Sequence, residues 1–216
     1  MDKALNIALV GASGVVGQKI LQLLEKKEIK IDNLFPLGKS TVGQAINFQN
    51  HEYIIGDLDS FDPKTANITI FSAGGSVAKK YAKKFVEAGS YVIDLSSEFR
   101  YDDDIPLIIP EINGDIIESL EEPTLIANPN CSTAQLVVAL KPLHDAFSVK
   151  RVVVSTYQAV SGAGRPAMDE LFNQTKGIFV NDSVQPEIFT KQIAFNAIPH
   201  IDVFLDDGFT KEEWKM

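Results

Sequence analysis

The stretch Ala4–Gly17, which reads ALNIALVGASGVVG, decides the fold. Its apolar first half predicts a buried strand, and the glycines Gly11, Gly14 and Gly17 follow at regular spacing. Apolar residues recur behind them at helical spacing as far as Lys26. A strand, a glycine turn and a helix in this order let backbone amides at the helix N-terminus approach a pyrophosphate. The alternative is a tight turn without a ligand, but the flanking strand and helix favour nucleotide binding.

Strand-like and helix-like segments alternate through the rest of the first 130 residues. Apolar runs predict strands at 33–37, 68–72, 91–95 and 124–127, and a helix at about 77–88. Such alternation indicates βαβ units and a parallel sheet. We therefore expect an α/β fold, with a Rossmann-like dinucleotide-binding domain over residues 1–130.

The pattern changes after residue 130. β-branched residues predict a strand over Arg151–Tyr157, and a helix is expected over Ala167–Thr175. Thr210–Glu213 has the form of a capping box, which opens a helix, although only three residues follow it. We therefore expect a second domain over residues 131–216, and we interpret residue 216 as a truncation point.

The composition narrows the possible functions. The 216 residues carry a formal net charge of −9, and 45% of them are hydrophobic. The negative charge argues against nucleic-acid binding, because phosphates need a basic face. No apolar run reaches the roughly 18 residues of a membrane span, and Met1–Leu5 does not open a signal peptide. The single cysteine excludes an internal disulfide, and the three histidines lack metal-ligand spacing. We expect a cytoplasmic protein that acts on small molecules without a metal.

The residues after the second predicted strand bear on the choice of dinucleotide. NAD-binding proteins usually place an Asp or Glu there, about 20 residues after the glycines, for the ribose 2′-hydroxyl. This chain has Lys39, Ser40 and Thr41 instead, and a cation with two hydroxyls suits a 2′-phosphate. The alternative is a solvated loop lysine, which is the commoner fate of lysine. We expect NADP in preference to NAD.

The same loop nearly matches the phosphate-binding loop of nucleotide triphosphatases. Asn33–Ser40 lacks the first glycine of that pattern, contains Pro36 and is not followed by a clear helix. We therefore reject a P-loop phosphotransferase, which would need Mg²⁺ and ATP at Lys39.

The single cysteine lies at the expected start of a helix, within Asn128–Thr133, which reads NPNCST. A cysteine at a helix N-terminus gains thiolate character from the helix dipole and the free amides. An isolated cysteine is more often a small buried hydrophobe. The polar approach favours a reactive Cys131, and Asn130 beside it is a candidate oxyanion donor.

Two further polar residues follow predicted strands. Arg100 could bind a phosphate or carboxylate with both arms of its guanidinium, although its position favours a surface salt bridge to Asp102–Asp104. Gln158 precedes the glycine-rich loop at 161–164, where it could orient a substrate, but loop formation is the safer interpretation. The residues alone leave both questions open.

Five motifs occur in order along the whole chain. They are Gly11–Gly17 (GASGVVG), Phe71–Gly75 (FSAGG), Asn128–Thr133 (NPNCST), Ser155–Gly164 (STYQAVSGAG) and Phe195–Asp202 (FNAIPHID). Together they resemble aspartate-semialdehyde dehydrogenase, and the third and fourth are the specific ones. The related N-acetyl-glutamyl-phosphate reductases have Gly where Asn130 stands.

The resemblance implies NADPH-dependent reduction of L-aspartyl 4-phosphate to L-aspartate 4-semialdehyde, with phosphate release, in lysine, threonine and methionine biosynthesis. It implies that Cys131 is the nucleophile that forms an acyl-thioester. Gln158, Arg100 and Asn130 would bind substrate, with Arg100 on the phosphate. The cofactor-binding positions would be Gly11, Ser13, Gly14, Val15, Val16, Lys39, Ser40, Thr41, Ser72, Ala73, Gly74, Ser161 and Gly162. Where this chain has Lys39-Ser40, the family often has Arg-Ser.

The resemblance also implies that parts of the site are absent. The family's acid/base histidine and remaining substrate-binding residues would lie beyond residue 216, and His200 stands where the family usually has Gln. Residues 131–216 would be the first part of an α+β catalytic and dimerisation domain, and the full-length protein a homodimer. Two alternatives remain, an enzyme like N-acetyl-glutamyl-phosphate reductase and a nucleotide-binding module in which Cys131 is inert.

Overall fold

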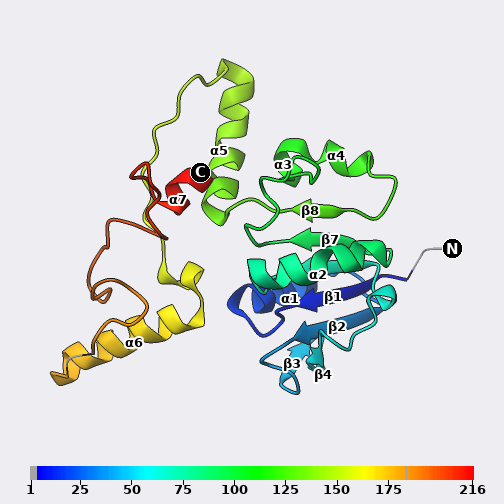
Figure 1. Cartoon of the computed structure of the whole chain (residues 1–216), viewed down its shortest axis with the longest axis horizontal. Coiled ribbons are helices and arrows are strands. Elements are labelled where there is room, and N and C mark those ends of the chain that lie inside the picture. The colour runs from blue at the N-terminus through cyan, green and yellow to red at the C-terminus, as the bar shows by residue number, and fades with distance from the viewer. Residues whose placement is uncertain (1–3, 183) are drawn as a thin grey trace. The chain divides into compact units, whose positions relative to one another are not determined.

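The structure is a computed structural model that describes residues 4–182 and 184–216. Residues 1–3 belong to the Met1–Leu5 stretch for which no signal peptide is expected, and they lie outside the described residues. The chain divides into two compact units, Met1–Phe147 and Ser148–Met216 (Figure 1). The division follows helix α5 (Cys131–Phe147), whereas the sequence suggests a domain boundary before it, at residue 131. That domain boundary stays a prediction.

A six-stranded sheet with the order β5-β2-β1-β6-β7-β8 forms the centre of the first unit. Its strands are β1 (Asn6–Val10), β2 (Asn33–Gly38), β5 (Gly56–Asp57), β6 (Ile68–Phe71), β7 (Tyr91–Asp94) and β8 (Leu125–Ala127). Every neighbouring pair is parallel. The predicted α/β fold with a parallel, Rossmann-like sheet is therefore confirmed.

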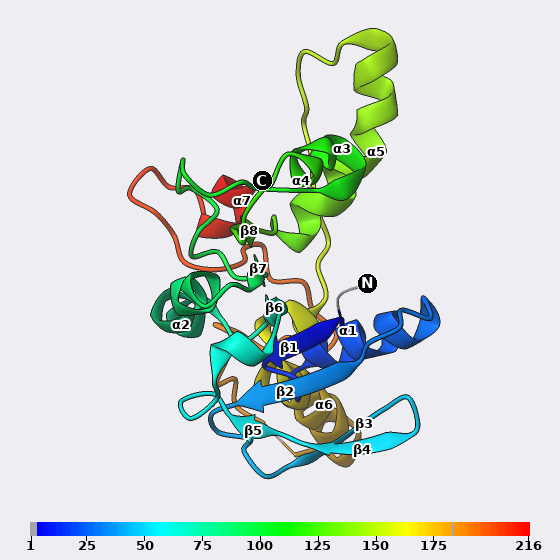
Figure 2. The same cartoon turned by 90° about the vertical axis from the view of Figure 1, so that its right-hand side faces the viewer.

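Helices cover both faces of this sheet, because the side chains of a strand alternate between faces. Ile7 and Leu9 of β1 pack on the face of α1 (Val15–Lys26), whereas Ala8 and Val10 pack on the face of α2 (Gly75–Glu87). Figure 2 shows the two helices on opposite sides of the strands. Leu9 and Val10 are fully buried, and burying each contributes about 1.5–3 kcal/mol.

The strand order switches at β1, because β2 lies on one side of β1 and β6 lies on the other. Ligands of open α/β sheets bind at the carboxyl ends of strands beside such a switch point. The glycine turn sits there, with the Gly11 amide donating to Leu37 O at 2.8 Å. Gly11 has φ +88°, and a Cβ on it would lie 2.9 Å from the Ser72 main chain. Only glycine fits between the two loops.

The structure contains an antiparallel hairpin, β3 (Ala45–Phe48) and β4 (His51–Ile54), that the sequence analysis missed. Its turn residues Gln49 and Asn50 have φ 49° and 63°. Two residues at positive φ are typical of a type I′ turn, which usually has Asn-Gly. The short helices α3 (Pro110–Asn113) and α4 (Asp115–Glu118) were missed as well.

The described residues of the second unit form two α-helices, α6 (Arg165–Val180) and α7 (Lys211–Lys215), and one short 3-10 helix. The predicted capping box is confirmed, because Thr210 Oγ1 accepts from Glu213 N and the Glu213 carboxylate accepts from Thr210 N. The strand predicted over Arg151–Tyr157 is wrong, because these residues lie exposed and outside any strand. A β-branched run forms a strand only where another strand offers main-chain partners, and none of the described residues pairs with it.

The buried face of α6 is polar and small rather than apolar, and it consists of Ala167, Glu170, Gln174 and Gly177. The Glu170 carboxylate accepts from the main-chain amides of residues 187 and 188, at 2.9 and 2.5 Å. Gln174 Oε1 accepts from the amides of residues 193 and 194, at 2.8 and 3.1 Å. These bonds attach the irregular segment after α6 to the helix. Burial opposes ionisation of Glu170, but the main-chain donors outweigh it and lower the pKa of the carboxyl.

Candidate active site

The glycine turn presents main-chain amides at the surface of the first unit. Gly14 caps α1, and Val15 and Val16 at the start of the helix are 40% and 51% exposed. The first amides of a helix have no acceptor within the helix and carry the positive end of its dipole. Ser13 Oγ lies 3.1 Å from Thr41 Oγ1, which links this turn to the loop after β2. The arrangement fits the pyrophosphate of a dinucleotide.

The loop after β6 lies against the glycine turn. Ser72 Oγ donates to Val10 O and Gly11 O at 3.0 and 3.3 Å, so the hydroxyl fixes the two loops together. Ala73 and Gly74 are exposed beside it, and Gly74 has φ +87° at the start of α2. The structure therefore brings together the predicted cofactor-binding residues of the glycine turn and of the loop after β6.

Lys39, predicted to bind a 2′-phosphate, is paired with a carboxylate. Its Nζ lies 3.1 Å from Asp59 Oδ2 and 3.0 Å from the Tyr81 hydroxyl. Lys39 is therefore an exposed lysine that is also part of a surface ion pair, so the alternative of a solvated loop lysine stays open. The sequence directly after β2 contains no carboxylate. In the folded chain, however, Asp59, which lies 20 residues after Lys39, supplies one next to Lys39. Ser40 is exposed, and Thr41 carries the bond to the glycine turn.

Cys131 is the first residue of α5 and is exposed. Asn130, which is 7% exposed, precedes it, and its carbonyl accepts the first helical bond from Ala134 N at 2.9 Å. Asn130 Oδ1 accepts from Ser132 N at 3.1 Å and from Cys131 Sγ at 3.2 Å. The side chain thus caps the helix, and its oxygen, rather than its amide donor, faces the thiol. The alternative of a buried structural cysteine is contradicted by the exposure.

Arg100 lies beside the loop that leads to Cys131. Its Nε donates to Asn128 O at 2.8 Å and its Nη2 to Leu95 O at 3.2 Å. The loop before Arg100 is held by Asp94, whose buried carboxylate accepts from Ser96 N and Ser96 Oγ at 3.1 and 2.6 Å. Burial raises the pKa of Asp94, whereas the Ser96 donors and the Arg100 charge oppose the rise. The structure therefore brings a guanidinium and a thiol to the same part of the first unit.

The other predicted site residues lie in the second unit. Gln158 is partly buried, and its Nε2 donates to Thr156 Oγ1 at 3.3 Å. Ser161 and Gly162 are exposed in a short 3-10 helix, Val160–Ala163, which ends at Gly164 with φ +88°.

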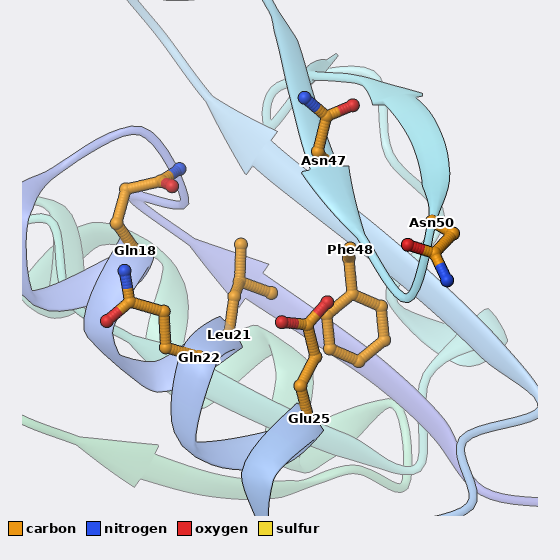
Figure 3. Close-up of a pocket in the computed structure, with 7 residues that line it drawn as sticks. All are labelled: Gln18, Leu21, Gln22, Glu25, Asn47, Phe48 and Asn50. Atoms are coloured by element: carbon orange, nitrogen blue, oxygen red, sulfur yellow. The ribbon is translucent and has the colours of Figure 1, made fainter.

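A separate cavity of about 510 Å³ lies between α1 and the β3–β4 hairpin. Figure 3 shows polar side chains around it above an apolar floor; the lining residues are Gln18, Leu21, Gln22, Glu25, Asn47, Phe48 and Asn50. None of the predicted site residues lines it. Among the described residues, no cluster of His, Cys, Asp and Glu could hold a metal ion, and no helix is long and apolar enough to span a bilayer.

Comparison with known proteins shows to which class of proteins this chain belongs. The family model described as semialdehyde dehydrogenase, NAD binding domain, matches residues 6–120, and the semialdehyde dehydrogenase dimerisation domain matches residues 140–216. The fold and both matches show that the chain belongs to the semialdehyde dehydrogenase class and contains a dinucleotide-binding domain. The chain belongs to the aspartate-semialdehyde dehydrogenase family.

Individual relatives support this assignment. The chain is 46% identical to the aspartate-semialdehyde dehydrogenase of a Shewanella species over the whole chain and 64% of that protein. It is 47% identical to that of Aquifex aeolicus over 98% of the chain and 63% of the relative. The crystal structure of Vibrio cholerae aspartate semialdehyde dehydrogenase II, complexed with ASA, is 44% identical, with a TM-score of 0.96 over 100% of this chain and 64% of that one. The chain therefore spans 63–64% of the length of these relatives, which is slightly less than two thirds.

The comparisons confirm the predicted family and a dinucleotide-binding domain. The choice of NADP over NAD, the roles of the individual site residues and the homodimer stay predictions.

Proposed function

We propose that this protein reduces L-aspartyl 4-phosphate to L-aspartate 4-semialdehyde with NADPH and releases phosphate. The observation that carries the proposal is that Cys131 is the first residue of α5, next to Asn130 and three residues after Asn128, whose carbonyl accepts from Arg100. Identity of 44–46% to aspartate-semialdehyde dehydrogenases over the whole chain supports the choice of substrate. The reaction would serve lysine, threonine and methionine biosynthesis in the cytoplasm.

Cys131 is the nucleophile of this proposal. Its exposed thiol gives its proton to solvent water, and the thiolate attacks the carbonyl carbon of the acyl phosphate. The bond from this carbon to the phosphate oxygen then breaks, phosphate leaves with the electron pair, and an acyl-thioester remains on Cys131. The amides at the start of α5 stabilise both the thiolate and the negative charge on the substrate carbonyl oxygen.

Arg100 holds the phosphate. A guanidinium binds a phosphate through two parallel N–H donors, and this one is anchored to the main chain at Asn128, three residues before Cys131. The anchoring supports this role, because it holds the guanidinium against the chain segment that leads to Cys131. A rigid attachment also reduces the conformational entropy that binding would otherwise remove.

The residues of the first unit hold the dinucleotide. The first amides of α1 bind the pyrophosphate, Lys39 with Ser40 and Thr41 binds the 2′-phosphate, and Ser72–Gly74 forms the adjoining wall. When bound, NADPH supplies the hydride that converts the thioester into the aldehyde and frees the thiolate. From the family resemblance we also propose that Gln158 binds substrate and that Ser161 and Gly162 contact the cofactor in the full-length protein. We further propose that the full-length protein is a homodimer, which the match to a dimerisation domain supports.

The test is Cys131→Ser in the full-length protein, assayed as phosphate-dependent reduction of NADP⁺ by aspartate semialdehyde. We expect a loss of turnover of about a thousandfold or more, because serine is the weaker nucleophile. The NADP⁺ dissociation constant should stay unchanged, because the glycine turn is untouched.

Omission of phosphate is the matched control, because a thioester mechanism needs phosphate to release the product in this direction. Turnover that survives the substitution would contradict the covalent mechanism. Binding of NADP⁺ by the wild-type protein without any turnover would favour the nucleotide-binding module.

A further inference from the structure

A cluster of two lysines, an aspartate and a tyrosine lies at the carboxyl end of β2, where the proposed function puts the 2′-phosphate. Register explains how the chain assembles it. Gly38 pairs with Asp57 in the parallel pair β2–β5, and Leu58 N donates to Gly38 O at 3.1 Å. The residues that follow, Lys39 and Asp59, therefore leave the sheet side by side.

Helix α2 completes the cluster with Lys80 and Tyr81. The Tyr81 ring is part of the apolar core, and its hydroxyl lies 2.7 Å from Lys80 Nζ and 3.0 Å from Lys39 Nζ. Asp59 Oδ1 accepts from the same hydroxyl and lies 3.4 Å from Lys80 Nζ. Because both ammonium groups contact one oxygen, they are close enough to contact one phosphate.

The carboxylate in this cluster is held by exchangeable partners. The side chains of Lys39, Asp59 and Lys80 are 42%, 49% and 56% exposed. Exposed ion pairs contribute little to stability, so a stronger anion can replace one partner. The hydrogen bond from Tyr81 and then that from Lys39 lower the pKa of Asp59 to about 2, so the carboxylate is charged at neutral pH. A phosphate monoester carries a larger negative charge, about −1.5 to −2, at this pH.

We propose that Lys80 is the second cation of the 2′-phosphate subsite and that Asp59 is an internal counter-ion which the phosphate displaces from both lysines. The inference rests on the proposed use of NADP. Asp59 is then the residue that limits the preference for NADP. It repels the phosphate, and it can also accept a hydrogen bond from the 2′-hydroxyl of NAD, as acidic residues at this place do in other dinucleotide-binding domains.

The experiment measures dissociation constants of NADP⁺ and NAD⁺ for the 216-residue chain by calorimetry. Lys80→Ala should weaken NADP⁺ binding about tenfold, the loss of one charge-assisted hydrogen bond, and leave NAD⁺ binding unchanged. Asp59→Asn should tighten NADP⁺ binding about threefold to tenfold through the removed repulsion and weaken NAD⁺ binding. Lys83→Ala is the matched control, because Lys83 is on the same helix with its ammonium over the Phe99 ring, and we expect no change.

A second probe pair isolates the phosphate. Adenosine 2′,5′-bisphosphate should follow the NADP⁺ pattern across the variants, and adenosine 5′-monophosphate should not follow it. Wild-type binding of NADP⁺ with unchanged affinity in both Lys80→Ala and Asp59→Asn would overturn this inference and leave the proposed cofactor intact. Weaker NADP⁺ binding by Asp59→Asn would overturn the role of Asp59 as a competitor. Binding of neither dinucleotide by the wild-type chain would contradict the proposed cofactor and this inference with it.

Discussion

Different interactions stabilise the interiors of the two units of the chain. The first unit has an apolar core on each face of a parallel sheet, with Leu9 and Val10 fully buried. The second has a polar helix face, with Glu170 and Gln174 bonded to main-chain amides. Many of its large apolar side chains are exposed, and Phe179, for example, is 77% exposed.

This difference teaches where hydrophobic periodicity predicts structure and where it does not. Periodicity works where the partner elements are close in the sequence and the core is apolar, as in the first unit. Exposed aromatic patches are typical of surfaces that bind other proteins. In the second unit we expect the exposed aromatic residues to be covered in the proposed homodimer.

The largest expected effect concerns catalysis by the 216-residue chain. It carries the dinucleotide-binding unit and Cys131, but it spans about 64% of the Shewanella relative. Groups that act as a unit fail together when members are removed, so we expect at least about a thousandfold lower turnover than in the full-length protein. Steady-state assay of both proteins measures this. Equal turnover, with contamination by full-length protein excluded, would show that the described units are sufficient.

The next effect tests the polar attachment in the second unit. Glu170→Ala leaves two main-chain amides without their acceptor, which destabilises the unit by about 2–4 kcal/mol. Trp214, the only tryptophan of the chain, lies in this unit, so its fluorescence during urea unfolding reports the change. Asp169→Ala is the matched control, because among the described residues Asp169 pairs only with Arg165, at 3.1 Å and in an exposed position. An unchanged Trp214 transition in Glu170→Ala would mean that the apolar contacts hold the unit.

A smaller effect is expected in the first unit at Lys39. Lys39→Ala should weaken NADP⁺ binding about tenfold and NAD⁺ binding much less, because one charge-assisted contact to the 2′-phosphate is lost. Fluorescence titration with NADPH and NADH measures both affinities. Tighter binding of NADH than of NADPH by the wild-type chain would refute the expected preference.

The smallest effect is a pH dependence of the second unit. Because the pKa of Glu170 is lowered in the folded state, its stabilisation is present above the unfolded value of about 4.3 and is lost as the pH falls through the folded value. The urea midpoint reported by Trp214 should therefore fall on acidification in this window. In Glu170→Gln the urea midpoint should fall less on acidification. An equal fall in the wild type and in Glu170→Gln would mean that other carboxyl groups cause the pH dependence.

The sequence predicts most of the sheet because each motif there acts locally. The glycines of Gly11–Gly17 mark a turn that only glycine can form, and the parallel strands read as continuous apolar runs. The β3–β4 hairpin was missed because Gln49-Asn50 is an unusual pair for its turn. The strand at Arg151–Tyr157 was predicted wrongly because β propensity does not tell whether a partner strand exists.

The candidate site divides in the same way. Cys131 and Asn130 could be placed from sequence, because a cap and a helix start are local features. The surroundings of Lys39 could not, because Asp59 arrives through the pairing of β5 with β2 and Lys80 through the packing of α2. A short strand such as Gly56–Asp57 leaves too little pattern to predict its register.

The most direct test of the account is to measure the mass of the peptide that contains Cys131 during catalysis. Full-length protein is mixed with aspartate semialdehyde and NADP⁺ without phosphate, quenched in acid and analysed by peptide mass spectrometry. The account predicts an aspartyl adduct on the peptide that contains Cys131, which disappears when phosphate is added before the quench. Formation of NADPH without an adduct on Cys131, or with an adduct on another residue, would contradict the central claim.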